Sequence, residues 1–248
     1  MKLSGNTILI TGGSEGIGLE LAKQLHPNNQ IIICGRTEEK LNQAKSHTPS
    51  LHTIQCDITD KNQVKSMLEQ IQKEHKKIDV LINNAGSKTE TNLRTDNEDT
   101  TLKKLEQDFA INYYAPINLI HQYLPLLKRT EQAAIINITT GLIYLPKAQQ
   151  AFYCAAKSAL HSYTQSLRWS LQDTGIQIIE VIMPLVNTNF HKGTLPSSIE
   201  AMPANIAAQK TIRAIRQDKH EIRLGKSNLA RYLAYFLKKT GMRLINQN

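Results

Sequence analysis

Short apolar segments alternate with longer segments of helical periodicity along most of the 248-residue chain. The apolar segments are rich in branched side chains and have the length of β-strands. They cover residues 6–11, 30–35, 51–56, 78–83, 133–139 and 176–183. The segments with helical periodicity cover residues 16–26, 37–46, 60–75, 99–128 and 151–172. Apolar strands that alternate with helices predict a parallel sheet covered by helices on both faces.

No linker rich in Pro, Gly or Ser divides this series, so we expect one α/β domain over residues 1–248. A further short segment, residues 221–225, is expected to add an edge strand, which makes about seven strands. The pattern therefore predicts a doubly wound parallel sheet of the Rossmann type. In such a sheet the ligand binds outside the carboxyl ends of the strands, and we expect the chemistry of this chain there.

The first predicted strand runs directly into the sequence TGGSEGIG, in which Gly12, Gly16 and Gly18 open a helix. Glycine permits the unusual backbone angles of such a turn, and the missing Cβ lets a pyrophosphate approach the helix N-terminus. A merely tight turn is the alternative interpretation. The position of the motif, after a strand and before a helix, favours a dinucleotide site.

The end of the second predicted strand distinguishes the two nicotinamide dinucleotides. An acidic residue there would bind the ribose 2′-hydroxyl group of NAD, but this chain has Gly35 followed by Arg36. The guanidinium group suits a 2′-phosphate, so NADP(H) is expected to be preferred over NAD(H). Two observations weaken this preference: Arg36 is also a plausible solvated residue near a helix start, and Glu15 adds a negative charge to the glycine loop.

Composition narrows the function classes. With 40% hydrophobic and 21% charged residues, the chain is typical of a globular cytoplasmic protein. It contains no eighteen-residue apolar run, and its first apolar run of four residues is too short for a signal sequence, so we expect neither secretion nor membrane spanning. Three widely spaced cysteines and the ungrouped histidines indicate packed thiols and no metal site.

The net charge of +9 is concentrated in the C-terminal part of the chain. Residues 201–248 hold ten Lys or Arg against two Asp or Glu, which leaves +1 for residues 1–200. The tail at about 226–248 is amphipathic, with Leu229, Leu233, Phe236 and Leu237 on one helical side. A packed helix with a solvated basic face is the simpler interpretation. Peripheral contact with an acidic membrane surface or a partner is the alternative, and nucleic acid is not expected.

Several ordered motifs resemble the short-chain dehydrogenase/reductase family between about residues 6 and 188. TGGSEGIG matches the glycine loop of that family, CDITD contains its aspartate after the third strand, and NNAG (83–86) matches its signature after the fourth. FAINYYAP and FYCAAK match its catalytic asparagine and its Y-x-x-x-K pair. More narrowly, GLIYLPKAQQAFYCAAK and MPLVNT resemble the subgroup of oxidoreductases named for D-alanylation of lipoteichoic acid.

The resemblance implies both a catalytic set and a cofactor site. The catalytic residues would be Tyr153, Lys157, Thr140 and Asn112. The family would place Asp57 beside the adenine and Lys157 on the nicotinamide ribose, with Asn112 supporting a water chain. The expected cofactor-binding residues are Gly12, Ser14, Glu15, Gly16, Ile17, Gly18, Arg36, Asp57, Ile58, Asn84, Ala85, Gly86, Tyr153, Lys157, Val186 and Thr188.

The spacing of Tyr153 and Lys157 is not specific by itself, since Tyr235 and Lys239 repeat it in the tail. Only the first pair has a hydroxyl, that of Thr140, thirteen residues upstream. Hydride transfer to a carbonyl carbon requires a proton on its oxygen, and a free tyrosine is a poor base at neutral pH. Lys157, one helical turn from the tyrosine, is expected to lower the pKa of Tyr153.

Two departures from the family pattern bear on activity. Thr140 stands where the family ordinarily has serine, which adds a methyl group and restricts χ1. Met183 and Pro184 replace the usual Pro-Gly pair after the sixth strand. Residues 142, 144 and 148 and a lid at 191–205, preceded by Phe190, are expected to face the substrate. His191 and Lys192 would belong to that lid, with His191 a lid or surface residue rather than a catalytic one.

We therefore expect an NADP(H)-dependent oxidoreductase that transfers a hydride between nicotinamide and a carbonyl or secondary alcohol, with Tyr153 as the general acid/base. The substrate would be a small molecule. A catalytically weak or inactive NADP(H)-binding regulatory protein is the alternative, because of Thr140 and the altered turn at Pro184. Family members usually form homodimers or homotetramers through the helices that flank the fifth strand, and the small residues Ala151, Ala155 and Ala159 would permit such packing.

Overall fold

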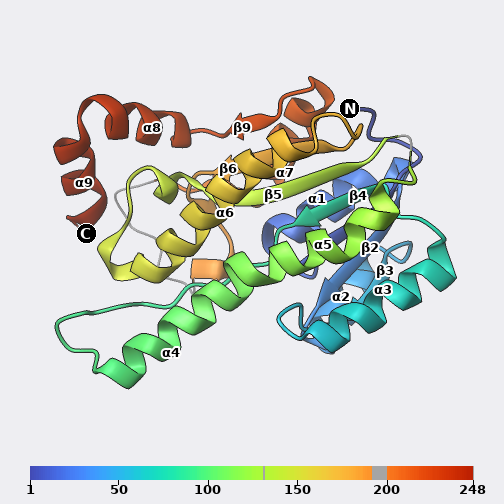
Figure 1. Ribbon diagram of the computed structural model, residues 1–248, viewed down its shortest axis with the longest axis horizontal. Helices are drawn as coiled ribbons and strands as arrows, with labels where there is room; N and C mark the ends of the chain where they lie inside the picture. Colours follow the sequence, from blue (N-terminus) through green and yellow to red (C-terminus); the bar gives the residue numbers. More distant parts are fainter. Residues whose placement is uncertain (131, 192–199, 248) are drawn as a thin grey trace.

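A single seven-stranded parallel sheet organises the computed structural model, which describes residues 1–130, 132–191 and 200–247. Its strand order is β3-β2-β1-β4-β5-β6-β9, so the order reverses between β1 and β4 (Figure 1). All its strand pairs are parallel, from β2–β3 at one side to β6–β9 at the other. The doubly wound parallel sheet expected from the apolar pattern is confirmed.

The strands lie close to their predicted positions. They are β1 (Thr7–Thr11), β2 (Gln30–Gly35), β3 (His52–Gln55), β4 (Val80–Asn83), β5 (Ala134–Thr140), β6 (Gln177–Met183) and β9 (Glu221–Arg223). Most of their side chains are buried, because helices cover both faces of the sheet. A separate pair, β7 (Val186–Asn187) and β8 (Met202–Pro203), was not predicted, and β8 falls within the expected lid at 191–205. Most of that lid, including Lys192, lies outside the described residues.

Helices of two groups pack against the two faces. Residues of α1 (Gly16–Leu25), α2 (Glu38–His47) and α7 (Ala204–Arg216) share one apolar core with the sheet. Residues of α3 (Lys61–His75), α5 (Ala115–Leu127) and α6 (Ala151–Ser170) share the other. The short turns η1 (His26–Asn28), η3 (Gly141–Ile143), η4 (Ala148–Gln150) and η5 (Asn189–His191) complete the connections. Cys34, Cys56 and Cys154 are buried and form no disulfide.

The helical pattern predicted over residues 99–128 forms three consecutive elements. Helix α4 (Glu98–Phe109) continues through the π-helical turn η2 (Ala110–Tyr114) into α5. The side chain of Asn97 caps the start of α4 by accepting a hydrogen bond from Thr100 N. A π-turn inside a long helix often occurs at functional sites, and this one contains Asn112.

The C-terminal tail differs from the single amphipathic helix that its pattern predicts. It forms α8 (Ser227–Phe236) and α9 (Lys238–Asn246), which pack against each other on the side of the molecule away from α2 and α3 (Figure 1). The chain turns at Leu237, whose backbone is not helical. Tyr235 and Lys239 therefore lie on different helices, and Tyr235 is 82% exposed. This second Y-x-x-x-K sequence forms no catalytic pair.

Candidate active site

A cavity of about 1200 Å³ lies at the carboxyl ends of the central strands, where the strand order reverses. Of the residues predicted for catalysis and cofactor binding, all but Gly18 and Asn112 line it. They come from the segments that follow β1, β2, β3, β4 and β6, from the last residue of β5, from the first turn of α1 and from the first two turns of α6. The topology thus gathers into one place residues that are far apart in the sequence.

The glycine loop is closed by contacts that leave no room for side chains. Gly12 has a φ of +62°, and a Cβ there would lie 2.9 Å from the Cα of Ala85. The Nδ2 atom of Asn84 donates to the carbonyl oxygens of Thr11 and Gly12 at 2.9 and 3.1 Å. A Cβ on Gly18 would lie 2.3 Å from the Gly12 oxygen. Gly18 therefore packs against the backbone of Gly12 and does not line the cavity.

Three charged side chains surround the cavity near the end of β2. Arg36 and Lys40 both line it, and Lys40 Nζ lies 2.7 Å from a carboxylate oxygen of Glu15. The hydrogen bond from Lys40 lowers the pKa of Glu15. Glu15, the acidic residue that weakened the expectation of NADP(H), is thus paired with a cation. The two positive charges of Arg36 and Lys40 exceed its single negative charge.

Tyr153 and Thr140 meet at the opposite part of the cavity. Thr140 ends β5, whereas Tyr153 lies in the first turn of α6. Burial is the largest influence on the Tyr153 hydroxyl and raises its pKa, while a hydrogen bond with Thr140 acts in the opposite direction. We expected Lys157 to lower this pKa below that of free tyrosine. That expectation was wrong for the protein without a cofactor, because loss of hydration outweighs the neighbouring groups.

Lys157 is buried at the same site. Its Nζ donates to the carbonyl oxygen of Ile138 at 2.9 Å. Burial lowers the pKa of Lys157 to about 8, and the negative charge of Glu180 opposes this effect. The lysine therefore remains largely protonated at neutral pH and loses its proton in the mildly alkaline range.

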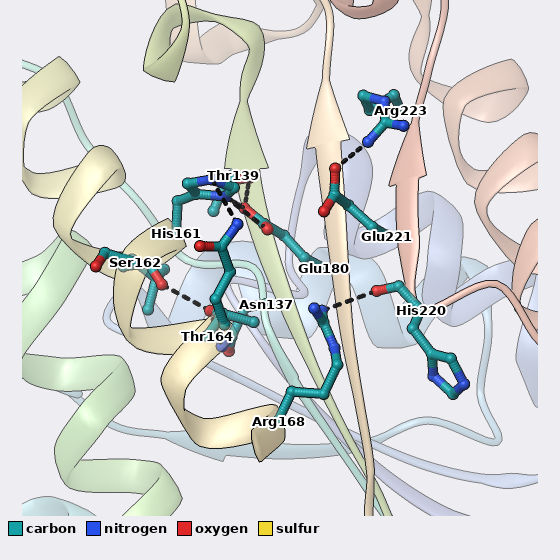
Figure 2. A network of polar contacts seen from close by, with 12 residues as sticks. Asn137, Thr139, His161, Ser162, Thr164, Arg168, Glu180, His220, Glu221 and Arg223 are labelled. Atoms are coloured by element: carbon teal, nitrogen blue, oxygen red, sulfur yellow. Dashed lines mark hydrogen bonds and ion pairs between the residues drawn. The ribbon is translucent and has the colours of Figure 1, made fainter. Parts of the chain in front are cut away.

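The buried acid Glu180, on β6, joins this strand to β5 and α6 through its hydrogen bonds with Thr139 and His161 (Figure 2). Glu180 has no solvent exposure and accepts hydrogen bonds from Thr139 Oγ1 at 2.6 Å and from His161 Nδ1 at 2.8 Å. His161 is one helical turn beyond Lys157 on α6. The hydrogen bond with Glu180 raises the pKa of His161. In the same layer, Asn137 donates to Thr164 Oγ1 at 2.8 Å.

Asn112 lies beneath the loop that follows β4. Its Nδ2 donates to the carbonyl oxygens of Ser87 and Asp108 at 2.8 and 2.9 Å. Its Oδ1 is buried without a hydrogen-bond partner among the described atoms, and a Cβ on Gly86 would lie 2.9 Å from it. The same Cβ would lie 3.8 Å from Lys157 Nζ. Asn112 and Lys157 thus flank Gly86, although the buried amide does not line the cavity.

The residues expected to face the substrate are only partly in place. Leu142, Phe190 and His191 line the cavity, whereas Tyr144 and Ala148 do not. The ring centroids of Phe190 and Tyr153 are 5.7 Å apart. Burial and the nearby Lys88 lower the pKa of His191 to about 4, so this imidazole is neutral at pH 7.

Sequence reasoning missed one wall of the cavity altogether. The C-terminal helices contribute Leu229, Ala230, Leu233, Gly241, Leu244 and Ile245 to the lining. It also missed Lys40, Lys88 and the buried Glu180. An acidic residue within the apolar segment 176–183 was the available signal for Glu180, since a buried carboxylate requires a partner.

A glycine-lined crevice beside a tyrosine, a lysine and a hydroxyl fits a nicotinamide dinucleotide, and comparisons with known proteins agree. The family model described as short chain dehydrogenase matches residues 6–197. The uncharacterized oxidoreductase DltE of Bacillus subtilis (strain 168) is 42% identical over 193 residues, which cover 77% of this chain and 76% of that protein.

Solved structures show the same fold. A short chain dehydrogenase from Burkholderia cenocepacia J2315 in complex with NADP superposes with a TM-score of 0.84 at 22% identity, covering 99% of this chain and 100% of that one. A short chain dehydrogenase/reductase from Burkholderia phymatum in complex with NAD has a TM-score of 0.84 at 16% identity, covering 99% of this chain and 97% of that one. The two structural relatives hold different dinucleotides.

Proposed function

The chain belongs to the short-chain dehydrogenase family and is an oxidoreductase that acts on CH–OH or C=O groups with NAD(P), and we propose that it is an NADP(H)-dependent carbonyl reductase or secondary-alcohol dehydrogenase. In this proposal Tyr153 is the general acid/base, Thr140 orients the substrate oxygen and Lys157 holds the nicotinamide ribose. The bound dinucleotide supplies the hydride.

One observation carries this proposal: Thr140 and Tyr153 both line the cavity that the glycine loop lines, and Thr140 is near enough to the Tyr153 hydroxyl to act on its pKa. A carbonyl oxygen placed between the two hydroxyls would accept hydrogen bonds from both. The raised pKa of Tyr153 means that its phenol is protonated at neutral pH, which is the form that donates a proton.

The proposed preference for NADP(H) rests on the charges around the adenosine end of the cavity. Arg36 and Lys40 supply two cations near the end of β2, and Lys40 neutralises Glu15. A 2′-phosphate would be stabilised by this arrangement, whereas no acidic side chain follows Gly35 to bind a free 2′-hydroxyl group. The remaining cofactor contacts would come from Asp57 and Ile58 at the adenine and from Val186 and Thr188 at the nicotinamide.

The decisive experiment is incubation of the protein with NADPH and a panel of aldehydes and ketones, followed by absorbance of the reduced cofactor. We expect oxidation with at least one carbonyl compound and its loss in Tyr153→Phe, while NADPH binding by calorimetry is retained. Identical rates for both proteins would refute the role of Tyr153. NADPH binding without turnover of any carbonyl would instead favour a regulatory protein, for which the Thr140 and Pro184 departures are the motivation.

We further propose that the whole chain acts as one domain and forms a homodimer or homotetramer in the cytoplasm. The outer surface of α4, η2 and α6 exposes Leu102, Tyr114 and Trp169, which supports an oligomer interface on this side. Light scattering should then give a multiple of the chain mass, and Ala155→Arg should reduce it. Within the described ranges no helix is long and apolar enough to cross a membrane.

A further inference from the structure

Helices α8 and α9 form a hairpin, residues 226–246, with an unusual outer surface. Six of the ten large hydrophobic side chains exposed in the described part of the chain belong to it. Tyr232, Tyr235 and Phe236 form an aromatic cluster, with ring centroids 4.9 and 5.3 Å from that of Phe236. Exposed apolar clusters of this kind mark surfaces that bind a partner or a membrane.

All charged side chains of the hairpin are positively charged. Lys226, Arg231, Lys238, Lys239 and Arg243 are basic, and the sequence contains no Asp or Glu after Glu221. Aromatic side chains beside lysines and arginines are the combination by which amphipathic helices bind the interface of an anionic bilayer. An anionic bilayer is therefore complementary to this surface in both polarity and charge.

A second copy of the chain is a poorer occupant of the same surface. A two-fold interface brings the same patch of each copy together. Five positive charges of one hairpin would then face five of the other, and juxtaposed like charges oppose association. The charge distribution thus favours a lipid surface over self-association through the hairpin.

The inner side of the hairpin contacts the loop that carries the catalytic hydroxyl. A Cβ built on Gly141, which follows Thr140, lies 3.3 Å from the Cβ of Ser227 at the start of α8. A Cβ on Gly241 of α9 would lie 2.8 Å from Leu145. Further along α9, Asn246 Oδ1 accepts a hydrogen bond from Ala148 N at 2.6 Å. The hairpin is thus held directly on residues 141–148.

The same hairpin lines the cavity with apolar side chains. Leu233 and Ile245 contribute to its wall, and Leu229 and Leu244 both line it and are about half exposed. These two leucines therefore connect the cavity with the outer apolar surface. An apolar chain that lies along them would reach from the outer surface into the cavity that Thr140 and Tyr153 line.

We propose that the hairpin docks the enzyme on an anionic membrane and that its substrate is an amphiphile, a carbonyl or secondary alcohol attached to a long apolar chain, taken from that membrane. The substrate class rests on the oxidoreductase activity proposed above. The proposed docking on a membrane does not rest on that activity, because it concerns only the outer surface of the hairpin.

Flotation of the full-length protein with vesicles tests docking without any turnover. The protein should float with vesicles of phosphatidylcholine mixed with phosphatidylglycerol and remain in solution with phosphatidylcholine alone. Lys238→Glu/Lys239→Glu should lower the bound fraction at least about tenfold. The matched reversal Lys65→Glu/Lys73→Glu, on exposed positions of α3, should leave it unchanged. An equal loss in both variants, or no flotation of the wild type, would overturn docking.

A second pair of variants tests the aromatic cluster. Phe236 and Leu93 are 65% and 68% exposed, so Phe236→Ser and Leu93→Ser remove apolar groups of similar exposure. Only Phe236→Ser should weaken flotation, by several-fold. If light scattering instead shows that Phe236→Ser dissociates an oligomer and the wild type does not float, the hairpin is a subunit interface and the proposal fails.

Kinetics with butanal, octanal and dodecanal test the substrate class. In the presence of anionic vesicles, kcat/KM should rise with chain length, and Lys238→Glu/Lys239→Glu should lower it for dodecanal but not for butanal. No rise with chain length would overturn the substrate class while leaving docking supported by flotation. If no carbonyl compound is turned over in any form, the proposed oxidoreductase reaction and the substrate class fail together, and the flotation result still decides docking.

Discussion

The Nδ1 atom of His161 lies 2.8 Å from a carboxylate oxygen of Glu180, which is completely buried on β6, the strand next to the one that ends at Thr140. A buried carboxylate without partners would be costly. Here Thr139 and His161 supply hydrogen bonds, and the charge of Lys157 lies close enough to interact with it. Glu180 thus interacts with both His161 and Lys157, which lie one helical turn apart on α6.

The first prediction concerns the titration of His161. Because Glu180 raises the pKa of His161 in the folded protein, the protonated pair stabilises the fold fully below the pKa of the unfolded histidine. That contribution is lost as pH rises through the higher folded value. Glu180→Gln should move the His161 resonance titration to lower pH and reduce the stability gained on acidification. Histidine NMR and thermal unfolding across this range measure both effects.

Glu221→Gln is the matched control for this experiment. Glu221 lies beside Glu180 on β9, but its side chain pairs with Arg223 (Figure 2). It also contributes less than Glu180 to the raised pKa of His161. The His161 titration should therefore move less in Glu221→Gln than in Glu180→Gln, and equal displacements would contradict a specific pair.

The second prediction follows from the counter-charge that Glu180 gives to Lys157. Since the pKa of Lys157 is about 8, NADPH binding that depends on its positive charge should weaken as pH rises through that value. Removing the negative charge in Glu180→Gln should lower this midpoint by on the order of one pH unit. Fluorescence titration of NADPH at a series of pH values provides the measurement and does not require a substrate.

Lys157→Met completes the test, because it removes the titrating group. Its NADPH affinity should be low and insensitive to pH in the alkaline range, with or without Glu180→Gln. If Glu180→Gln still displaced the midpoint in a Lys157→Met background, the carboxylate would act through another group. Glu221→Gln again serves as the control and should keep the wild-type midpoint.

Local patterns in the sequence predict most of this fold, because each strand and helix is encoded by its own apolar period. The glycine loop and the spacing of Thr140 and Tyr153 are equally local, since both depend on one strand, one turn and one helix. The ion pair of Lys40 with Glu15 is not, because it joins the start of α1 to α2 across 25 residues. Nothing in the periodicity of either helix specifies that contact.

The C-terminal hairpin shows a second limit on what hydrophobic periodicity can predict. Its apolar residues follow a helical period, and that period predicts one packed helix. The non-helical backbone at Leu237 ends α8, and residues 238–246 form a second helix in a different direction. Periodicity shows which residues share a helix face only as long as the helix continues. The tertiary contacts of Gly241 and Asn246 with residues 145–148, which hold the second helix in place, are not encoded in that period.

The third prediction concerns cofactor preference. Arg36→Gln should weaken NADP(H) binding by roughly tenfold to a hundredfold, the range of a lost charge-assisted hydrogen bond, with little effect on NAD(H). Lys40→Gln should also weaken NADP(H) binding, because it removes the cation that neutralises the Glu15 carboxylate and leaves this charge with only the hydrogen bond from Asn189. Calorimetry with both dinucleotides measures these changes.

A double variant separates the two roles of Lys40. If its main effect is to neutralise Glu15, then Glu15→Gln/Lys40→Gln should recover most of the NADP(H) affinity lost in Lys40→Gln. If Lys40 contacts the phosphate directly, the double variant should remain weak. Equal affinities of the wild type and Arg36→Gln for NADP(H) would contradict the proposed preference.

The fourth prediction addresses the threonine that replaces the usual serine. Thr140 lines the cavity together with Tyr153, and its Oγ1 accepts a hydrogen bond from Leu142 N at 3.3 Å, which holds the turn that follows β5. Thr140→Ser keeps the hydroxyl and should retain kcat within a few-fold. Thr140→Val keeps the shape but removes the hydroxyl that would hold the substrate oxygen, and should lower kcat about a hundredfold or more. Steady-state kinetics on the best carbonyl substrate, at saturating NADPH, make the comparison.

Thr140→Ala distinguishes the hydroxyl from the methyl group. If the methyl group narrows the site, Thr140→Ala should bind larger substrates with a lower KM than Thr140→Val does, while both share the low kcat. Calorimetric NADPH affinity should be the same in all three variants, because no cofactor contact is assigned to Thr140. A kcat of Thr140→Val equal to that of the wild type would show that Tyr153 acts without this hydroxyl, and the observation that carries the proposed reaction would lose its force.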